Sequence, residues 1–167
     1  MNKEYYLNLR NKYLPEKLNL IFILESPPAS GKYFYDETGK TSEPLFNELM
    51  KAFNYKPVDK KDGLNFYKSK GYFLVDSTYK PVNKLKGKER NNTILTDFSD
   101  LIDDLEKIDS SKRTPLILVK ANVWQLLESR LLSNGFIVLN KGLVVPFPST
   151  GQQKRFQQKF ATCFNNI

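Results

Sequence analysis

Residues 18–35 read LNLIFILESPPASGKYFY, an apolar run that ends abruptly at Glu25 and two prolines. Because nearly every position of Leu18–Leu24 is apolar, the run predicts a strand buried on both faces, which is typical of a parallel strand covered by helices. Pro27 and Pro28 prevent further ladder pairing and fix the shape of the following loop. Ligands bind at the carboxyl ends of strands in open α/β sheets. The stretch therefore predicts a candidate site after this strand, although an ordinary strand exit has the same pattern.

The rest of the chain alternates between strand-like and helix-like patterns, which favours α/β architecture. We expect a three-layer α/β/α sandwich around a central, mostly parallel four-stranded sheet. The predicted strands are Leu18–Leu24, Tyr72–Val75, Pro115–Val119 and Phe136–Leu139. Helices are expected over Glu4–Leu14, Pro44–Phe53, Asp97–Ile108, Val123–Leu132 (capped by Asn122) and Gln152–Phe164. Lys56–Lys70 is expected to be mainly loop with at most a short helix, and Lys80–Arg90 a basic loop. At 167 residues, the chain fits a single domain, 1–167.

The composition limits the possible location and chemistry of the protein. No apolar run is long enough to span a bilayer, and no signal-peptide pattern opens the chain. The single Cys163 indicates a reducing compartment. We therefore expect a cytoplasmic monomer without membrane association.

The chain contains no histidine. This excludes histidine acid–base catalysis, Ser-His and Cys-His nucleophiles, and metal sites that need an imidazole. One cysteine cannot build a thiolate cluster either. We expect no structural zinc and no cofactor.

The net charge of +8 is unevenly distributed along the chain. Residues 51–90 hold eleven Lys and Arg against four Asp and Glu, and residues 97–109 hold six acids against Lys107. The dipole of the predicted helix explains the acids better than a metal site does. The basic stretch also carries Tyr55, Phe66, Tyr67, Tyr72, Phe73 and Tyr79. Lysines and aromatic rings together are compatible with a nucleic-acid surface, while the alternative is that the lysines only solvate the protein.

Four sequence pieces occur in an order that resembles the uracil-DNA glycosylase superfamily, over roughly residues 18–160. In that family a first buried strand ends in Gly-Gln-Asp-Pro or Gly-Glu-Ala-Pro, and Leu24–Pro27 resembles this motif. A later strand of the form Gly-Val-Phe-Leu-x-Asn is similar to Gly71–Asp76. An acidic helix, a strand and a further helix follow, as over Phe98–Leu132. The last family motif is His-Pro-Ser before a helix with basic residues, and Phe147–Ser149 resembles it.

The resemblance implies a DNA-repair hydrolase that cleaves the N-glycosidic bond of a modified or damaged base in single- or double-stranded DNA. The expected catalytic residues are Glu25, Ser26 and Asp76, with Glu25 as the base that activates water. The expected substrate-binding residues are Pro27, Tyr33, Phe34, Phe147 and Ser149. The expected nucleic-acid contacts are Lys84, Lys86, Lys154 and Arg155.

The departures from the family pattern fall on the chemistry. Phe147 stands at the position of the motif histidine and cannot stabilise charge on a departing base. Asp76 stands at the position of an asparagine, and an ionised carboxylate would favour a base that presents amino groups over uracil. Two alternatives therefore stay open. One is a catalytically inactive module of this fold that binds nucleic acid or a nucleotide. The other is a flavodoxin-like or nucleotide-binding domain, although Ser30-Gly31-Lys32 lacks Walker spacing.

Overall fold

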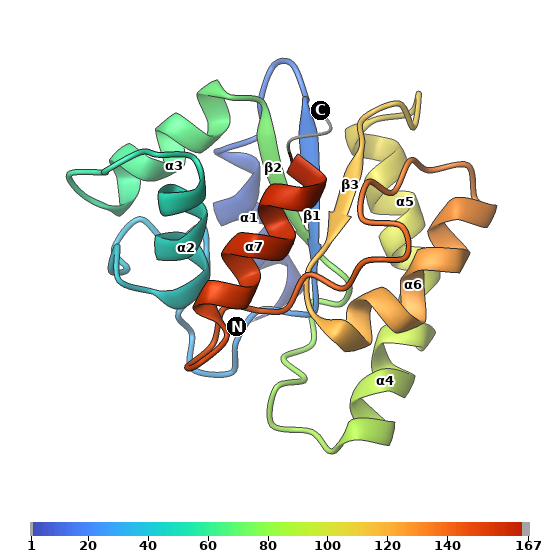
Figure 1. Ribbon diagram of the computed structural model, residues 1–167. Helices are drawn as coiled ribbons and strands as arrows, with labels where there is room; N and C mark the ends of the chain where they lie inside the picture. The colour runs from blue at the N-terminus through green and yellow to red at the C-terminus, as the bar shows by residue number, and fades with distance from the viewer. Residues whose placement is uncertain (1, 165–167) are drawn as a thin grey trace.

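The computed structural model describes residues 2–164 and has an α/β fold. Its sheet consists of β1 (Leu20–Leu24), β2 (Tyr72–Asp76) and β3 (Leu116–Leu118). All pairings are parallel and the strand order is β2-β1-β3. Leu24 pairs with Asp76 and Ile23 pairs with Leu118, so the three strands end at the same edge. This edge is the lower one in Figure 1.

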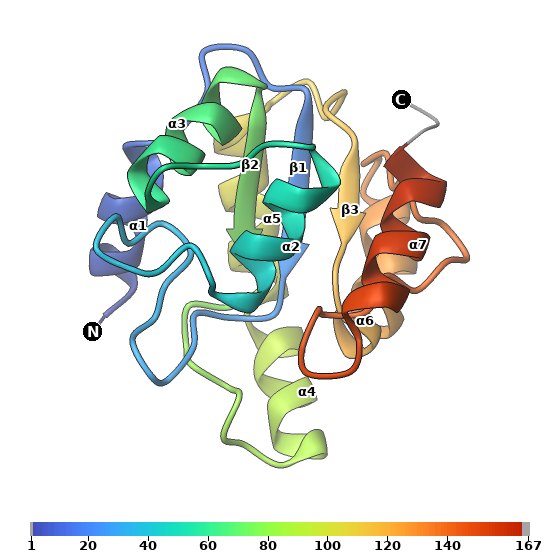
Figure 2. The same ribbon diagram turned by 60° about the vertical axis from the view of Figure 1, so that its left-hand side comes forward.

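Seven helices flank the sheet within the described residues. They are α1 (Lys3–Asn11), α2 (Pro44–Ala52), α3 (Lys60–Ser69), α4 (Gly87–Thr96), α5 (Phe98–Ile108), α6 (Ala121–Ser133) and α7 (Gln153–Phe164). Figure 2 shows α2 in front of the sheet and α5 behind it. Because helices cover both faces, all five residues of β1 are buried, as its unbroken apolar sequence predicts. None of the described helices is long and apolar enough to cross a membrane.

Two segments that were expected to be mainly loop contain full helices. α3 fills most of Lys56–Lys70 and is capped by Asp59, whose side chain accepts a hydrogen bond from the Asp62 amide. This is an ordinary N-cap that the polar sequence obscured. α4 begins within the predicted basic loop, at Gly87. Asn122 is not the cap of α6, because that helix already begins at Ala121.

The predicted fourth strand, Phe136–Leu139, is wrong, and the sheet has three strands. Val138 forms only an isolated parallel bridge with Leu116. The chain then turns at Asn140, whose carboxamide accepts a hydrogen bond from the Leu118 amide and donates one to the Leu118 carbonyl, both 2.9 Å long. A side chain thus takes the place of the next stretch of strand backbone, which ends the ladder.

A second side chain occupies the opposite edge of the sheet. The hydroxyl of Tyr35, which is fully buried, accepts a hydrogen bond from the Leu74 amide at 2.7 Å and donates one to the Leu74 carbonyl at 3.1 Å. The peptide groups of Leu74 on β2 and Leu118 on β3 are therefore both satisfied by side chains rather than by a neighbouring strand.

The aromatic residues of the basic stretch pack against the core, and two of them lie within it. Tyr67 and Phe73 are fully buried. Tyr55 and Phe66 stack on each other with their ring centroids 3.9 Å apart. Tyr67 and Phe73 are therefore not available to stack on bases, and the four partly buried rings pack against the core.

Candidate functional site

A cavity of about 320 Å³ opens at the carboxyl ends of β1 and β2. The side chains that line it include seven predicted site residues: Glu25, Ser26, Pro27, Tyr33, Phe34, Asp76 and Phe147. Leu74, Val119 and Lys120 also line it, so all three strands or their exits contribute. The parallel register brings these exits together, which is the usual reason for a site at this edge.

Glu25, the first residue after β1, is held from several directions. Its side chain is only 8% exposed. Oε2 accepts a hydrogen bond from Lys120 Nζ, and Oε1 accepts one from Asn122 Nδ2 at 2.6 Å. Arg90 Nε lies 3.7 Å from Oε1. These donors fix the carboxylate in one orientation at the cavity wall.

The loop after Glu25 is fixed by the segment that follows β2. The Thr78 amide donates to the Glu25 carbonyl at 3.2 Å, and the Val82 amide donates to Ser26 Oγ, also at 3.2 Å. The Ser26 hydroxyl in turn donates to the Pro27 carbonyl at 3.1 Å. Ser26 therefore lines the cavity while its hydroxyl joins the two loops.

Asp76 is a buried carboxyl group whose Oδ2 has no hydrogen-bond partner among the described residues. Tyr33 Oη is buried and unpartnered in the same way. Burial raises the pKa of Asp76 to about 7, although the nearby Tyr33 hydroxyl and Arg10 guanidinium act in the opposite direction. Near neutral pH, Asp76 is thus divided between a carboxylate, which only accepts hydrogen bonds, and a carboxylic acid, which can also donate one.

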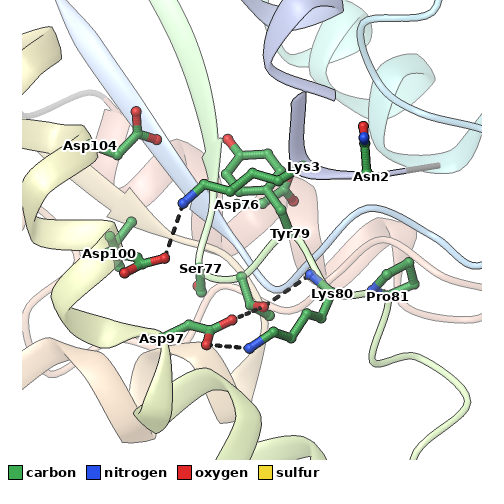
Figure 3. Close-up of a pocket in the computed structure, with 12 residues that line it drawn as sticks. Asn2, Lys3, Asp76, Ser77, Tyr79, Lys80, Pro81, Asp97, Asp100 and Asp104 are labelled. Carbon is green, nitrogen blue, oxygen red and sulfur yellow. Dashed lines mark hydrogen bonds and ion pairs between the residues drawn. The ribbon is translucent and has the colours of Figure 1, made fainter. Parts of the chain in front are cut away.

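A second cavity, of about 340 Å³, lies beside Asp76 and is lined by Asp97, which precedes α5, and by two acids of α5 (Figure 3). Asp97 accepts from Thr78 and from Lys80, both at 2.7 Å. Asp100 pairs with Lys3 at 3.0 Å. The third acid, Asp104, binds the buried Arg10 through both carboxylate oxygens. These acids are therefore paired with cations of the protein itself, and the described residues contain no group of three metal-binding side chains.

The remaining predicted contacts lie outside the first cavity. Ser149 is exposed in the turn before α7 and is not one of the cavity-lining residues. Lys84 and Lys86 precede the first turn of α4, Lys154 and Arg155 lie in the first turn of α7, and all four are exposed. Figures 1 and 2 both show α4 and the start of α7 at the end of the molecule to which the strands point.

Sequence reasoning missed the residues that hold Glu25, namely Lys120, Asn122 and Arg90. The place of Lys120 was a usable signal, because it directly follows the buried strand residues Leu116–Val119. A charged side chain at a strand exit is a site candidate for the same reason that Glu25 is.

The cavity brings together a fixed carboxylate, an adjacent ammonium group, a second buried carboxyl group and aromatic rings. This combination can bind a flat, partly polar ring and stabilise separated charges within it. No protein-family model, curated protein or solved structure matches the chain.

Proposed function

We propose that the protein is a uracil-DNA glycosylase-like hydrolase of the N-glycosidic bond of a modified or damaged base in DNA, with the three-layer α/β/α arrangement of that superfamily. One observation carries the proposal: Glu25, Asp76 and Phe147 line a single cavity at the carboxyl edge of the sheet. They belong to three separate sequence motifs that resemble the superfamily. The parallel register alone brings Glu25 and Asp76 together, so the presence of Phe147 in the same cavity is the part of this observation that supports the motif order.

The dimensions and walls of the cavity support a nucleobase as its occupant. About 320 Å³ is at the small end of ligand pockets, which span about 300–1,000 Å³. Pro27, Phe34, Leu74 and Phe147 supply apolar walls, and base–aromatic stacking contributes about 1–3 kcal/mol per base. Asp76 supplies a carboxyl oxygen, Oδ2, that has no hydrogen-bond partner within residues 2–164. The pocket thus offers stacking on a ring face and recognition of a ring edge.

Glu25 is the residue that we assign to the reaction centre. Cleavage of a glycosidic bond passes through a transition state with positive charge on the sugar. A carboxylate held rigidly in a largely buried position stabilises such charge without reorganisation. A carboxylate has about four lone-pair sites, so the hydrogen bonds from Lys120 and Asn122 leave capacity for an attacking water.

DNA reaches such a pocket only when the target base is single-stranded or flipped out of the duplex. The exposed residues Lys84, Lys86, Lys154 and Arg155 lie in segments at the pocket end of the molecule (Figure 1). We propose that they contact phosphates, which position a nucleic acid without reading its sequence.

Binding without cleavage is the second candidate function, and Phe147 favours it. Its side chain has no hydrogen-bond donor for a departing base, and the loss of one such donor typically costs about 10²–10³ in rate. A protein of this kind would hold a base in the cavity and release nothing.

Base release from single- and double-stranded oligonucleotides that carry deaminated or alkylated bases tests both candidates. We expect slow release by the wild type and no release by Glu25→Gln, which keeps the size of the side chain and removes its basicity. Glu16→Gln, at an exposed position before β1, is the matched control and should behave as the wild type.

The outcomes separate the two functions. Base-specific binding without release by the wild type would support the binding module. Release that is unchanged in Glu25→Gln would contradict the role of Glu25. Neither release nor base-specific binding would overturn both candidates.

A further inference from the structure

The proposed reaction needs a group that neutralises the negative charge on the departing base. The chain has no histidine, and Phe147 cannot serve. Two lysines, Lys32 and Lys120, line the cavity. Lys32 is exposed on the loop after the prolines, whereas the ammonium of Lys120 lies against Glu25 inside the site. Lys120 is thus the cation placed closest to the proposed reaction centre.

The backbone of Lys120 is held in a conformation that side chains disfavour. Its φ is +90° and its ψ is 137°, close to a region that is essentially restricted to glycine. The Lys120 amide donates to the Val145 carbonyl at 2.8 Å, and α6 begins at the next residue. Strain of this kind persists where the surrounding structure imposes it and often occurs at functional sites. Here it accompanies a lysine side chain that reaches into the cavity.

Arg90 is the other cation beside Glu25, and its contacts give it a different role. Its Nε donates to the Val82 carbonyl at 3.1 Å, and its NH2 group donates to the Asn83 carbonyl at 2.7 Å. Arg90 is therefore engaged in holding the segment before α4. The ammonium of Lys120, by contrast, is hydrogen-bonded to Glu25 alone among the described residues, and its side chain is 31% exposed.

We propose that Lys120 is a catalytic residue whose ammonium group donates a hydrogen bond to the departing base, a role for which the chain has no histidine. This inference rests on the proposed glycosidase function. Heterolysis of an N-glycosidic bond leaves positive charge on the sugar and negative charge on the base. In the ion pair of Glu25 and Lys120, the carboxylate can stabilise the positive sugar and the ammonium the negative base. Both charges are in place before the substrate binds.

The pair also closes the proton balance of the reaction. The electrons of the C1′–N bond leave with the base, and a water oxygen adds to C1′. The proton that this water loses passes to Glu25, and the base anion takes a proton from Lys120. Because Glu25 and Lys120 are hydrogen-bonded, the proton on Glu25 returns to Lys120. The net change is the addition of one water across the C1′–N bond, and both side chains recover their starting state.

The ammonium group restricts the class of substrate. It favours a base with a carbonyl oxygen beside the glycosidic nitrogen, as in 2-oxopyrimidines, because negative charge spreads onto that oxygen. It disfavours N-alkylated cationic bases. Such a base is repelled by the charge of Lys120 while it is bound, and it leaves as a neutral molecule that needs no cation to stabilise it. The pocket should therefore select pyrimidine-type lesions.

A leaving-group series tests the role of Lys120. Single-turnover release of 5-fluorouracil, uracil and thymine is measured with the wild type, Lys120→Met, Lys120→Arg and Lys120→Gly. We expect Lys120→Met to slow uracil release by about 10²–10³-fold. The loss should be smallest for 5-fluorouracil, which needs the least stabilisation as an anion, and largest for thymine. Lys120→Arg should recover part of the rate, since it keeps the charge.

Controls distinguish catalysis from folding. Oligonucleotide affinity should change by no more than a few-fold in Lys120→Met, and Lys17→Met, at the amino end of β1, should behave as the wild type. Lys120→Gly also removes the ammonium, and glycine adopts the positive φ without strain. It therefore provides a second variant that is expected to fold. An equal loss for all three bases, or full activity of Lys120→Met, would overturn the inference while leaving the glycosidase function intact. No release of any base by the wild type would overturn both.

Discussion

Glu25 and Lys120 lie 95 residues apart in the sequence, and their side chains form an ion pair across the carboxyl ends of β1 and β3. Glu25 is almost fully buried, so the loss of its partner leaves a poorly compensated charge. The pair therefore affects stability as well as the proposed chemistry.

We expect Lys120→Met to lower the free energy of unfolding by about 1.5–3 kcal/mol, the range for a hydrogen bond to a charged group. Adding Glu25→Gln to this variant should recover part of the loss, since the unpaired charge is then gone. Urea unfolding of the wild type, both single variants and the double variant gives the coupling energy. Additive losses would show that the two side chains do not interact.

The backbone conformation of Lys120 can be tested separately from its charge. Lys120→Ala and Lys120→Gly both remove the ammonium, but only the alanine keeps a Cβ at φ +90°. We expect the glycine variant to be more stable than the alanine variant by about 1 kcal/mol, after allowing for the greater flexibility of unfolded glycine. Thermal unfolding of the two proteins side by side measures the difference. A more stable alanine variant would contradict the assignment of strain.

Asp76 should make the protein less stable as the pH rises toward neutrality. Its pKa is about 7 in the folded protein and near 3.8 when unfolded, so the folded state binds more protons between these values. The associated stability is complete below pH 3.8 and is lost as the pH rises through 7. Asp76→Asn has no such titration. Between pH 4 and pH 8, the unfolding free energy of the wild type should therefore fall by about 3–4 kcal/mol more than that of Asp76→Asn. Parallel profiles of unfolding free energy between pH 4 and 8 would contradict the shift.

The same substitution addresses base recognition. Protonated Asp76 can donate a hydrogen bond to a uracil carbonyl, and ionised Asp76 cannot. Under the proposed function, uracil release by the wild type should fall as the pH rises through about 7, the value to which burial raises the pKa of Asp76. Asp76→Asn should not show this fall, because its amide donates at every pH. Rates measured from pH 5.5 to 8.5 decide between these profiles.

Nucleic-acid binding should depend on salt through the basic residues near the pocket. Each phosphate contact contributes about −0.7 to −0.9 to the log–log slope of affinity against salt. Replacing Lys154 and Arg155 by alanine should therefore make the slope shallower by about 1.4–1.8, if both bind phosphate. Lys17 and Lys70, exposed before β1 and β2, form the matched double control. An unchanged slope would show that Lys154 and Arg155 do not contact phosphates.

The two side chains at the sheet edges should be important for stability. Tyr35→Phe leaves the amide and carbonyl of Leu74 without their partner, and Asn140→Leu does the same to Leu118. Each should lower the free energy of unfolding by about 1–3 kcal/mol, the cost of an unsatisfied buried polar group. Tyr5→Phe, at a partly exposed tyrosine, is the control and should change the free energy of unfolding little.

The sequence predicted those parts of the fold that depend on local pattern. The unbroken apolar run of β1 and the i, i+3, i+4 stripe of α5 report directly which faces are buried. α3 and α4 have polar sequences, and their position is set by packing that a local pattern does not contain. The prediction of a fourth strand was wrong because the Asn140 side chain binds the peptide group of Leu118. This is a tertiary contact that the local sequence pattern does not contain.

The candidate site shows the same division. Glu25 and Asp76 could be predicted because each ends a recognisable strand, and the parallel register then places them at one edge. The partners of Glu25 come from distant parts of the chain, so nothing near Glu25 in the sequence indicates them. The burial of Asp76, and hence its raised pKa, is likewise a property of the folded protein alone.

The side chains at the two sheet edges also limit what the protein can associate with. An open strand edge invites pairing with another chain, which leads to domain swapping or aggregation. In this sheet, the Tyr35 hydroxyl and the Asn140 carboxamide already bind outward-facing peptide groups of the two outer strands. A strand that adds to either edge would have to displace the two hydrogen bonds of the side chain at that edge before it could pair there. Short as it is, the sheet is thus protected against growth by strand addition.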